Sequence, residues 1–137
     1  MSKEAVLIVD HGSRKKAAND MIFSVVNACQ KKLDTHIVVG AHMELADPSI
    51  LDGFKTCVEQ GATYITVIPF MLSPGRHSTE DIPNLCHEAS IECNNIPYCV
   101  TTHFGEHELV SEILAQKALA CPKKENTACP KCNERSK

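Results

Sequence analysis

Two patterns of hydrophobic and polar positions follow one another along the chain, and each predicts one kind of element. Four strands are predicted, at 5–9, 36–41, 63–70 and 97–102. The first is a continuous apolar run, as expected of a strand that is covered on both faces, and the third is rich in β-branched residues. After each predicted strand, apolar residues recur every three or four positions, which is typical of a helix with one buried stripe. The chain is therefore predicted to contain four strand–helix units in a row.

The ends of the predicted helices carry signals of their own. We expect Ser13 to be the N-cap of the first helix, whose buried stripe has seven members: Ala18, Met21, Ile22, Val25, Val26, Cys29 and Leu33. Asp47-Pro48 predicts an N-cap followed by a proline at the first position of the second helix. Gly61 is expected to end that helix, and the last helix is expected to end near Ala120.

Strands that alternate with helices predict an α/β domain, with a four-stranded parallel sheet between helices on both faces, as a three-layer sandwich. We expect this domain to span residues 1–120 and residues 121–137 to form a short, irregular, cysteine-rich tail. No apolar run approaches the ~20 residues that cross a bilayer, so a membrane protein is not expected. The N-terminus runs directly into a strand, which favours a cytoplasmic protein without a leader peptide.

Histidines mark the edge of the sheet at which such folds bind their ligands. Ligands of parallel α/β sheets bind beyond the carboxyl ends of the strands, and each of the four predicted strand ends leads to a histidine: His11, His42, His77 and His103. Glu44 and Glu106-His107 lie close to two of these ends. Histidine and carboxylate ligands suit divalent metals, so the sequence predicts a metal site at this edge.

These residues do not carry equal weight. His11 and His77 are favoured as metal ligands, because each lies in a turn with glycine and arginine at a strand–helix junction. For the other three histidines of this edge, an ordinary polar loop residue is the alternative: His42, His103 and His107. For Glu44, which lies in an apolar stretch, the alternative is a core or capping carboxylate.

The turns also suggest a partner for anions. Gly12-Ser13 and Gly75-Arg76 are explained by turn chemistry alone, or they expose backbone N–H groups to a carboxylate or phosphate. Arg14 opposes the helix dipole at a helix N-terminus, which favours an anionic ligand, and the alternative is a solvated first turn of Arg14, Lys15 and Lys16. The sequence has no GxGxxG, Walker or GxSxG pattern, so neither a nucleotide site nor a serine nucleophile is supported. The net charge of −3 argues against a nucleic-acid partner.

Of the eight cysteines, five lie in the predicted domain and three in the tail. Three lie on the apolar faces of predicted helices, where cysteine behaves as a small hydrophobe: Cys29, Cys57 and Cys86. Three others form a C-x7-C-x2-C pattern in the tail, which suits zinc or an iron–sulfur cluster: Cys121, Cys129 and Cys132. A fourth ligand would come from Cys99, another part of the chain or a second subunit. The alternative is a tail of free thiols.

Several segments together resemble one family. Val9–Arg14, His42–Ile50, Pro69–Pro83 and the Gly105-Glu106-His107 segment are similar, in order and spacing, to the single-domain sirohydrochlorin chelatases of the CbiX/SirB type. The resemblance covers about residues 5–120, and the stretch Pro69–Pro83 is its most specific part. The tail resembles that of plastid-type members, which carry an iron–sulfur cluster on C-terminal cysteines.

The resemblance implies a fold, a reaction and an assembly. It implies a chelatase-type parallel α/β fold and a homodimer that inserts a divalent metal into sirohydrochlorin: Fe²⁺ in siroheme synthesis, Co²⁺ in cobalamin synthesis and Ni²⁺ in some archaeal members. The family's two metal-binding histidines fall on His11 and His77 here. It also implies a [2Fe–2S] cluster on Cys121, Cys129 and Cys132, and the plastid stroma as the compartment of a processed form.

The predicted function is therefore sirohydrochlorin ferrochelatase. His11 and His77 are expected to hold the metal, one of them also to take a pyrrole proton, and Glu44 to orient groups or relay protons. Five residues at the two turns are expected to meet the substrate's carboxylates: Gly12, Ser13, Arg14, Gly75 and Arg76. The alternatives are a cobaltochelatase, a metal carrier without turnover, and a redox protein that depends on the tail.

Overall fold

The computed structural model describes residues 2–120, apart from the side chains of His77 and Ser78. Residue contacts divide the chain into two units, Met1–His103 and Phe104–Lys137. The first unit contains the whole sheet, and the described part of the second contains the helix α4 (Glu108–Ala120). The predicted boundary after residue 120 coincides with the end of the described residues and stays a prediction, as does the cysteine-rich tail, which lies outside them.

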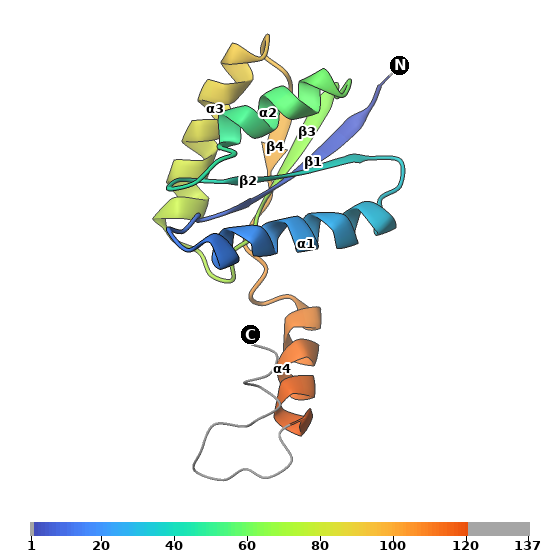
Figure 1. Cartoon of the computed structure of the whole chain (residues 1–137), viewed down its shortest axis with the longest axis vertical. Helices are drawn as coiled ribbons and strands as arrows, with labels where there is room; N and C mark the ends of the chain where they lie inside the picture. Colours follow the sequence, from blue (N-terminus) through green and yellow to red (C-terminus); the bar gives the residue numbers. More distant parts are fainter. Residues whose placement is uncertain (1, 121–137) are drawn as a thin grey trace. The chain divides into compact units, whose positions relative to one another are not determined.

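The first unit is a three-layer α/β sandwich (Figure 1). Its four strands are all parallel, in the order β2-β1-β3-β4: β1 (Glu4–Asp10), β2 (Ile37–His42), β3 (Tyr64–Pro69) and β4 (Tyr98–Val100). One helix covers one face and two helices cover the other: α1 (Lys16–Lys32), then α2 (Ile50–Glu59) and α3 (Ile82–Glu92). The predicted fold class is confirmed, although β4 is shorter than the predicted run.

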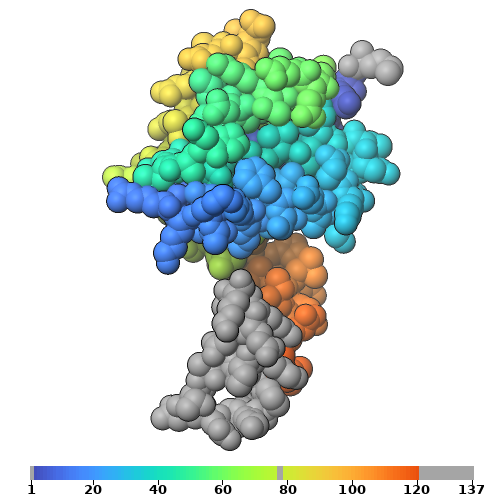
Figure 2. All heavy atoms as spheres, in the orientation of Figure 1, coloured from blue at the N-terminus to red at the C-terminus, as the bar shows by residue number. Residues whose placement is uncertain are grey.

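The central position of β1 in the sheet explains why its sequence does not alternate between apolar and polar residues. Successive side chains of a strand point to opposite faces, and here both faces are covered. Leu7 and Val9 lie in the core beneath α2 and α3, whereas Val6 and Ile8 lie with Ile22 of α1 in a second cluster. The space-filling view shows the outer surfaces of α1 and α2, which leave little of β1 visible (Figure 2).

The start of α1 differs from the sequence prediction. Its N-cap is Lys15, which makes no side-chain capping bond, so Ser13 is not the N-cap. The Ser13 hydroxyl accepts the Lys15 N–H at 3.0 Å, and the Ser13 backbone is bonded in both directions to the Asn19 side-chain amide. These local bonds hold Ser13 in the turn before the helix. The predicted stripe is also narrower, because Ala18 and Met21 are exposed.

The start of α2 differs as well. Its N-cap is Ser49 and not Asp47, and Ser49 forms a capping box with Asp52 through two bonds of 3.1 Å. The physical reason is that the Pro48 carbonyl accepts the His42 N–H at 2.8 Å, which keeps this residue paired with the end of β2. The predicted helix end is confirmed, since α2 is followed by Gly61 with a φ of +99°.

Helix α4 forms where the sequence predicts it, and none of its residues is buried. Four of its apolar side chains are more than half exposed: Leu109, Ile113, Leu114 and Leu119. Within residues 2–120, no helix combines the length and the apolar character required to cross a membrane.

Candidate metal centre

Two loops at the carboxyl edge of the sheet line a common cavity. The first loop (residues 11–15) follows β1 and the second loop (residues 70–75) follows β3, and these two strands are hydrogen-bonded neighbours. His11 and all six residues of the second loop line a cavity of about 440 Å³. The two loops therefore meet at this edge of the sheet, and the volume of the cavity is in the range of small-molecule sites.

The first loop has little conformational freedom. Gly12 has a φ of +87°, and a Cβ at this position would lie 1.8 Å from the carbonyl oxygen of Glu44, so only glycine fits. The backbone is also tied to the segment after β2. The Met43 N–H donates to the Asp10 carbonyl at 2.9 Å, and the Glu44 N–H donates to the His11 carbonyl at 3.1 Å. His11 therefore sits on a backbone that its neighbours fix.

A buried histidine–carboxylate pair lies behind this loop. His42 is fully buried, and its Nδ1 lies 2.6 Å from Oδ1 of Asp10, whose side chain is 14% exposed. The Phe23 ring packs edge-on against the imidazole, with ring centroids 5.9 Å apart. The alternative of a polar loop residue is wrong for His42. Sequence reasoning missed Asp10, and the register Asp10↔His42 identifies the pair only once β1 and β2 are known to be neighbours.

The second loop is open by contrast. Leu72 is 62% exposed, and a Cβ at Gly75 would meet no atom within 4 Å. The Gly75 carbonyl accepts the Thr79 N–H and hydroxyl at 2.9 and 2.7 Å, at the start of a short π-helical turn, η1 (His77–Asp81). The His77 side chain lies outside the described residues, so a site built from two histidines stays a prediction.

The remaining predicted carboxylate and histidines differ in their surroundings. Glu44 is exposed, so the alternative of a core carboxylate is wrong, and it is followed by Leu45 at a φ of +69°. Positive φ in a non-glycine residue stores strain of the kind that gathers at functional sites. His103 is half-buried, and His107 accepts the Leu109 N–H at 3.1 Å at the beginning of α4.

The groups predicted to bind anions are of two kinds, backbone amides and arginine side chains, and the structure places them differently. The Gly12 N–H donates to Asp10 Oδ1 at 3.1 Å and the Ser13 N–H to Asn19 Oδ1 at 2.8 Å, so both amides have acceptors within the chain. Arg14 is exposed. The Arg76 side chain is 79% exposed, with its Nε 3.5 Å from a Glu80 oxygen. The two arginines are therefore better placed than the amides to meet a charged ligand.

Two buried thiols of the first unit, Cys57 and Cys86, are unsuited as metal ligands. Among the side chains that the structure describes, no three His, Cys, Asp or Glu residues gather closely enough to hold a metal ion. Burial raises the pKa of Cys57 and of Cys86 to about 12, so both remain protonated thiols at neutral pH. Metal binding needs the thiolate. Both cysteines are buried in the core, which confirms their interpretation as small hydrophobes.

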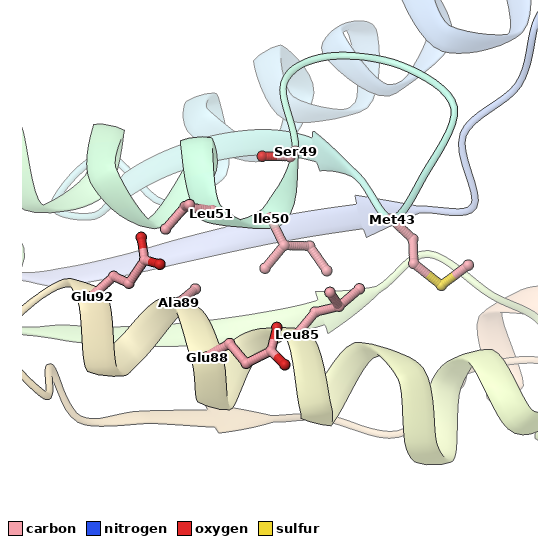
Figure 3. Close-up of a pocket in the computed structure, with 8 residues that line it drawn as sticks. All are labelled: Met43, Ser49, Ile50, Leu51, Leu85, Glu88, Ala89 and Glu92. Carbon is pink, nitrogen blue, oxygen red and sulfur yellow. The ribbon is translucent and has the colours of Figure 1, made fainter.

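A second, smaller cavity lies elsewhere, between α2 and α3. Its volume is about 130 Å³, and Figure 3 shows side chains from both helices pointing toward each other across it. Ile50 and Leu85 give it an apolar floor, and Glu88 and Glu92 lie on its α3 side. Because no histidine lines it, this cavity does not fit the predicted metal chemistry.

The fold and the position of the larger cavity define the class of protein. This is a parallel α/β domain with a ligand cavity beyond the carboxyl ends of adjacent strands, and a histidine lines that cavity. The chain belongs to the CbiX family, whose model matches residues 5–120.

Named relatives agree with this membership. The chain is 42% identical over 118 residues to the chloroplastic sirohydrochlorin ferrochelatase of Arabidopsis thaliana. The matched region covers 86% of this chain and 52% of the relative. It is 35% identical over 114 residues to the sirohydrochlorin ferrochelatase of Priestia megaterium, covering 83% of this chain and 43% of the relative. The chain thus spans about half the length of these relatives or less.

Solved structures give the same result. The sirohydrochlorin chelatase SirB from Bacillus subtilis subspecies spizizenii, in complex with cobalt, superposes with a TM-score of 0.77 at 30% identity, covering 87% of this chain and 51% of SirB. SirB from Bacillus subtilis with Fe³⁺ gives a TM-score of 0.79 at 30% identity, covering 88% of this chain and 48% of SirB.

Proposed function

We propose that this chain is a sirohydrochlorin chelatase that inserts Fe²⁺ into the macrocycle. One observation carries the proposal: His11 lines a cavity between neighbouring strand ends, in a chain that is 42% identical to a ferrochelatase for this substrate. The metal is a substrate of the reaction and not a resident cofactor.

The chemistry of insertion defines what the residues must do. Two pyrrole N–H protons leave the macrocycle as one divalent cation enters, so the site needs a neutral nitrogen ligand and a proton acceptor. We assign the ligand role to His11 and His77, with one of them also taking a pyrrole proton. Glu44 is exposed, and its N–H is bonded to the His11 carbonyl, which supports a role for its carboxylate in relaying protons.

The substrate's eight carboxylates need cationic partners. Arg14 follows the Gly12-Ser13 turn in the first loop, and Arg76 comes directly after the second loop. Each arginine is therefore close in the sequence to residues that line the cavity. Both side chains are exposed, which supports their assignment to substrate binding. The amides of Gly12, Ser13 and Gly75 remain part of the assignment, and the first two would have to exchange their internal acceptors.

Three finer parts of the proposal depend on regions beyond the described residues or on assembly. A homodimer is supported by the single four-stranded sheet of the first unit, because the region that matches SirB covers only about half of that protein, 51%. A [2Fe–2S] cluster or zinc on Cys121, Cys129 and Cys132 is supported by their spacing alone. The name of the Arabidopsis relative favours the plastid stroma over the cytoplasm as the compartment.

Each finer part has its own measurement. Sedimentation equilibrium of the whole chain gives the mass of the assembly, and a monomer at all concentrations contradicts the homodimer. Metal and sulfide analysis of anaerobically purified protein, beside a Cys129→Ser/Cys132→Ser variant, reports on the tail. A chain without bound metal contradicts the cluster proposal but leaves chelation by His11 unaffected.

The decisive test is an anaerobic metallation assay. Purified chain is incubated with sirohydrochlorin and Fe²⁺, and the visible spectrum of the macrocycle is followed beside His11→Ala and His77→Ala. We expect the wild type to accelerate insertion and both variants to lose at least about a hundredfold of that gain, since each removes a metal ligand. Wild-type insertion at the uncatalysed rate would overturn the proposal.

Cobalt and carrier functions are the competing proposals. The cobalt alternative has weaker support: the chain is 35% identical over 112 residues to the sirohydrochlorin cobaltochelatase of Priestia megaterium, against 42% over 118 residues to the Arabidopsis ferrochelatase. The same assay with Co²⁺ decides the preferred metal from the ratio of kcat/KM values. A carrier would bind the metal without changing the macrocycle spectrum.

A further inference from the structure

The pair Asp10–His42 is a largely buried polar arrangement beside His11 to which the proposed reaction gives no role. Oδ1 of Asp10 lies 2.6 Å from His42 Nδ1 and also accepts the Gly12 N–H at 3.1 Å. Asp10 and Gly12 flank His11 in the chain. The pair is therefore connected to the candidate metal ligand through its backbone on both sides.

The buried position of the His42 imidazole lowers the stability of the fold. His42 is fully buried, and its Nε2 has no hydrogen-bond partner within the part of the chain that the structure describes. Burying a polar atom without a partner lowers stability. A phenylalanine would fill the same place against Phe23 without such an atom. What imidazole supplies in addition is a donor, because a carboxylate only accepts hydrogen bonds and Nδ1 must therefore carry the hydrogen.

That donor fixes the carboxylate. The Asp10 side chain is only 14% exposed, and the His42 N–H holds its Oδ1 where the Gly12 N–H can reach it. Without the donor, the carboxylate would turn toward water to recover its solvation. The Gly12 N–H would lose its acceptor, and one of the bonds that hold the backbone around His11, beside those that the Met43 and Glu44 N–H groups donate to the Asp10 and His11 carbonyls, would be lost.

We propose that Asp10 and His42 are a positioning pair that orients His11 toward the metal. Neither residue is a ligand; together they fix the backbone between Asp10 and Gly12 and, with it, the direction of the His11 side chain. The proposal deepens the function proposed above and rests on it.

Two substitutions of His42 separate positioning from stability. His42→Phe keeps the ring and its packing against Phe23 but removes the donor. His42→Asn keeps an N–H close to the position of Nδ1 but loses most of the ring volume. We measure anaerobic Co²⁺ binding to the full chain and take the part that is lost in His11→Ala, which excludes metal bound elsewhere.

The two His42 variants are expected to rank in one order by Co²⁺ affinity and in the opposite order by unfolding temperature. His42→Phe weakens the His11-dependent Co²⁺ affinity about tenfold, the lower end for residues that orient a metal ligand. His42→Asn stays within about threefold of the wild type, although it unfolds at a lower temperature than His42→Phe. A merely structural pair would give an affinity that follows the unfolding temperature, and that result, or unchanged binding in His42→Phe, would overturn the proposal.

Ser90→Ala is the matched control. The buried Ser90 hydroxyl donates to the Ile96 carbonyl at 2.7 Å, beyond the end of α3 and outside the metal cavity. Its loss lowers the unfolding temperature and leaves the Co²⁺ affinity unchanged. A weakened affinity in this variant would show that binding follows general stability and would contradict the positioning role.

A double substitution keeps the test valid if His42→Asn does not fold. Asp10→Ala and Asp10→Ala/His42→Phe should bind Co²⁺ equally, because the two residues act through one carboxylate. Effects that multiply would overturn the pair. The metallation assay keeps the two proposals distinct: an inactive wild type refutes chelatase function, whereas an active wild type with unaffected His42→Phe refutes the positioning pair alone.

Discussion

The two loops that line the cavity look alike in the sequence and differ in the structure. Each follows a strand and contains a glycine near a histidine and an arginine. In the first loop, Gly12 has no room for a Cβ and its N–H is held by Asp10. In the second, a Cβ at Gly75 would meet no atom within 4 Å and Leu72 is mostly exposed. The first loop is thus closely packed at its glycine, whereas the second loop is open at its glycine and at Leu72.

This difference suggests a division of labour at the cavity. A metal ligand must be held in place before the metal arrives, because disorder at the ligand weakens binding. A flat macrocycle, in contrast, needs a surface that can adjust to it. The first loop therefore fits the task of fixing the proposed metal ligand His11, and the second loop, which leads to the other proposed ligand His77, fits the task of offering an apolar surface to the macrocycle.

The largest expected effect comes from filling the space at Gly12. In Gly12→Ala, the new Cβ meets the Glu44 carbonyl at 1.8 Å, and the residue must also hold a φ of +87°. We expect the free energy of unfolding to fall by about 2–5 kcal/mol, from the left-handed backbone and the steric overlap together. Urea denaturation measures this change.

The matched substitution in the second loop is Gly75→Ala. Its Cβ meets no atom within 4 Å and no positive φ opposes it, so stability should change by less than about 1 kcal/mol. Equal losses in the two variants would show that the loops do not differ in the way that the structure indicates.

A smaller effect is expected at the segment that supports the first loop. Ser49→Ala removes the capping box of α2, which follows directly on the segment 43–48. The loss should be about 1 kcal/mol, the usual contribution of an N-cap serine. Thr79→Ala, beside the second loop, removes an exposed hydroxyl bond of 2.7 Å to Gly75 and should cost less than about 0.5 kcal/mol. Thermal unfolding ranks the two, and the reverse order would contradict the comparison.

The sequence predicts the fold much better than it predicts this contrast. Buried strands such as β1 are local apolar runs, so their pattern alone predicts a parallel sheet with helices on both faces. The fixed state of the first loop arises from contacts across strands: His42 reaches Asp10, and Glu44 blocks the space at Gly12. These residues are more than 30 positions apart, and no local pattern records their approach.

Local competition explains the errors at the helix starts. Ser13 and Asp47 both have the chemistry of an N-cap, and each lies two residues before the N-cap that the structure shows. Asn19 binds the backbone of Ser13, and the His42 N–H binds the carbonyl of Pro48, so both segments stay in loop conformation. Helix propensity identified the helices correctly, but it takes no account of these competing hydrogen bonds.

A substitution at Leu72 is expected to have the smallest effect on stability and a specific effect on the KM for the substrate. The side chain lines the cavity but is 62% exposed, so Leu72→Ser should change the free energy of unfolding by less than about 0.5 kcal/mol. If the macrocycle covers this side chain, the lost apolar contact of about 1 kcal/mol raises the KM for sirohydrochlorin about fivefold and leaves kcat unchanged. Ile91→Ser on α3, 54% exposed and not among the cavity residues, is the control and should change neither constant. A KM that stays constant in Leu72→Ser would mean that the second loop does not contact the macrocycle, and the division between a loop that fixes His11 and a loop that offers an apolar surface to the macrocycle would then be wrong.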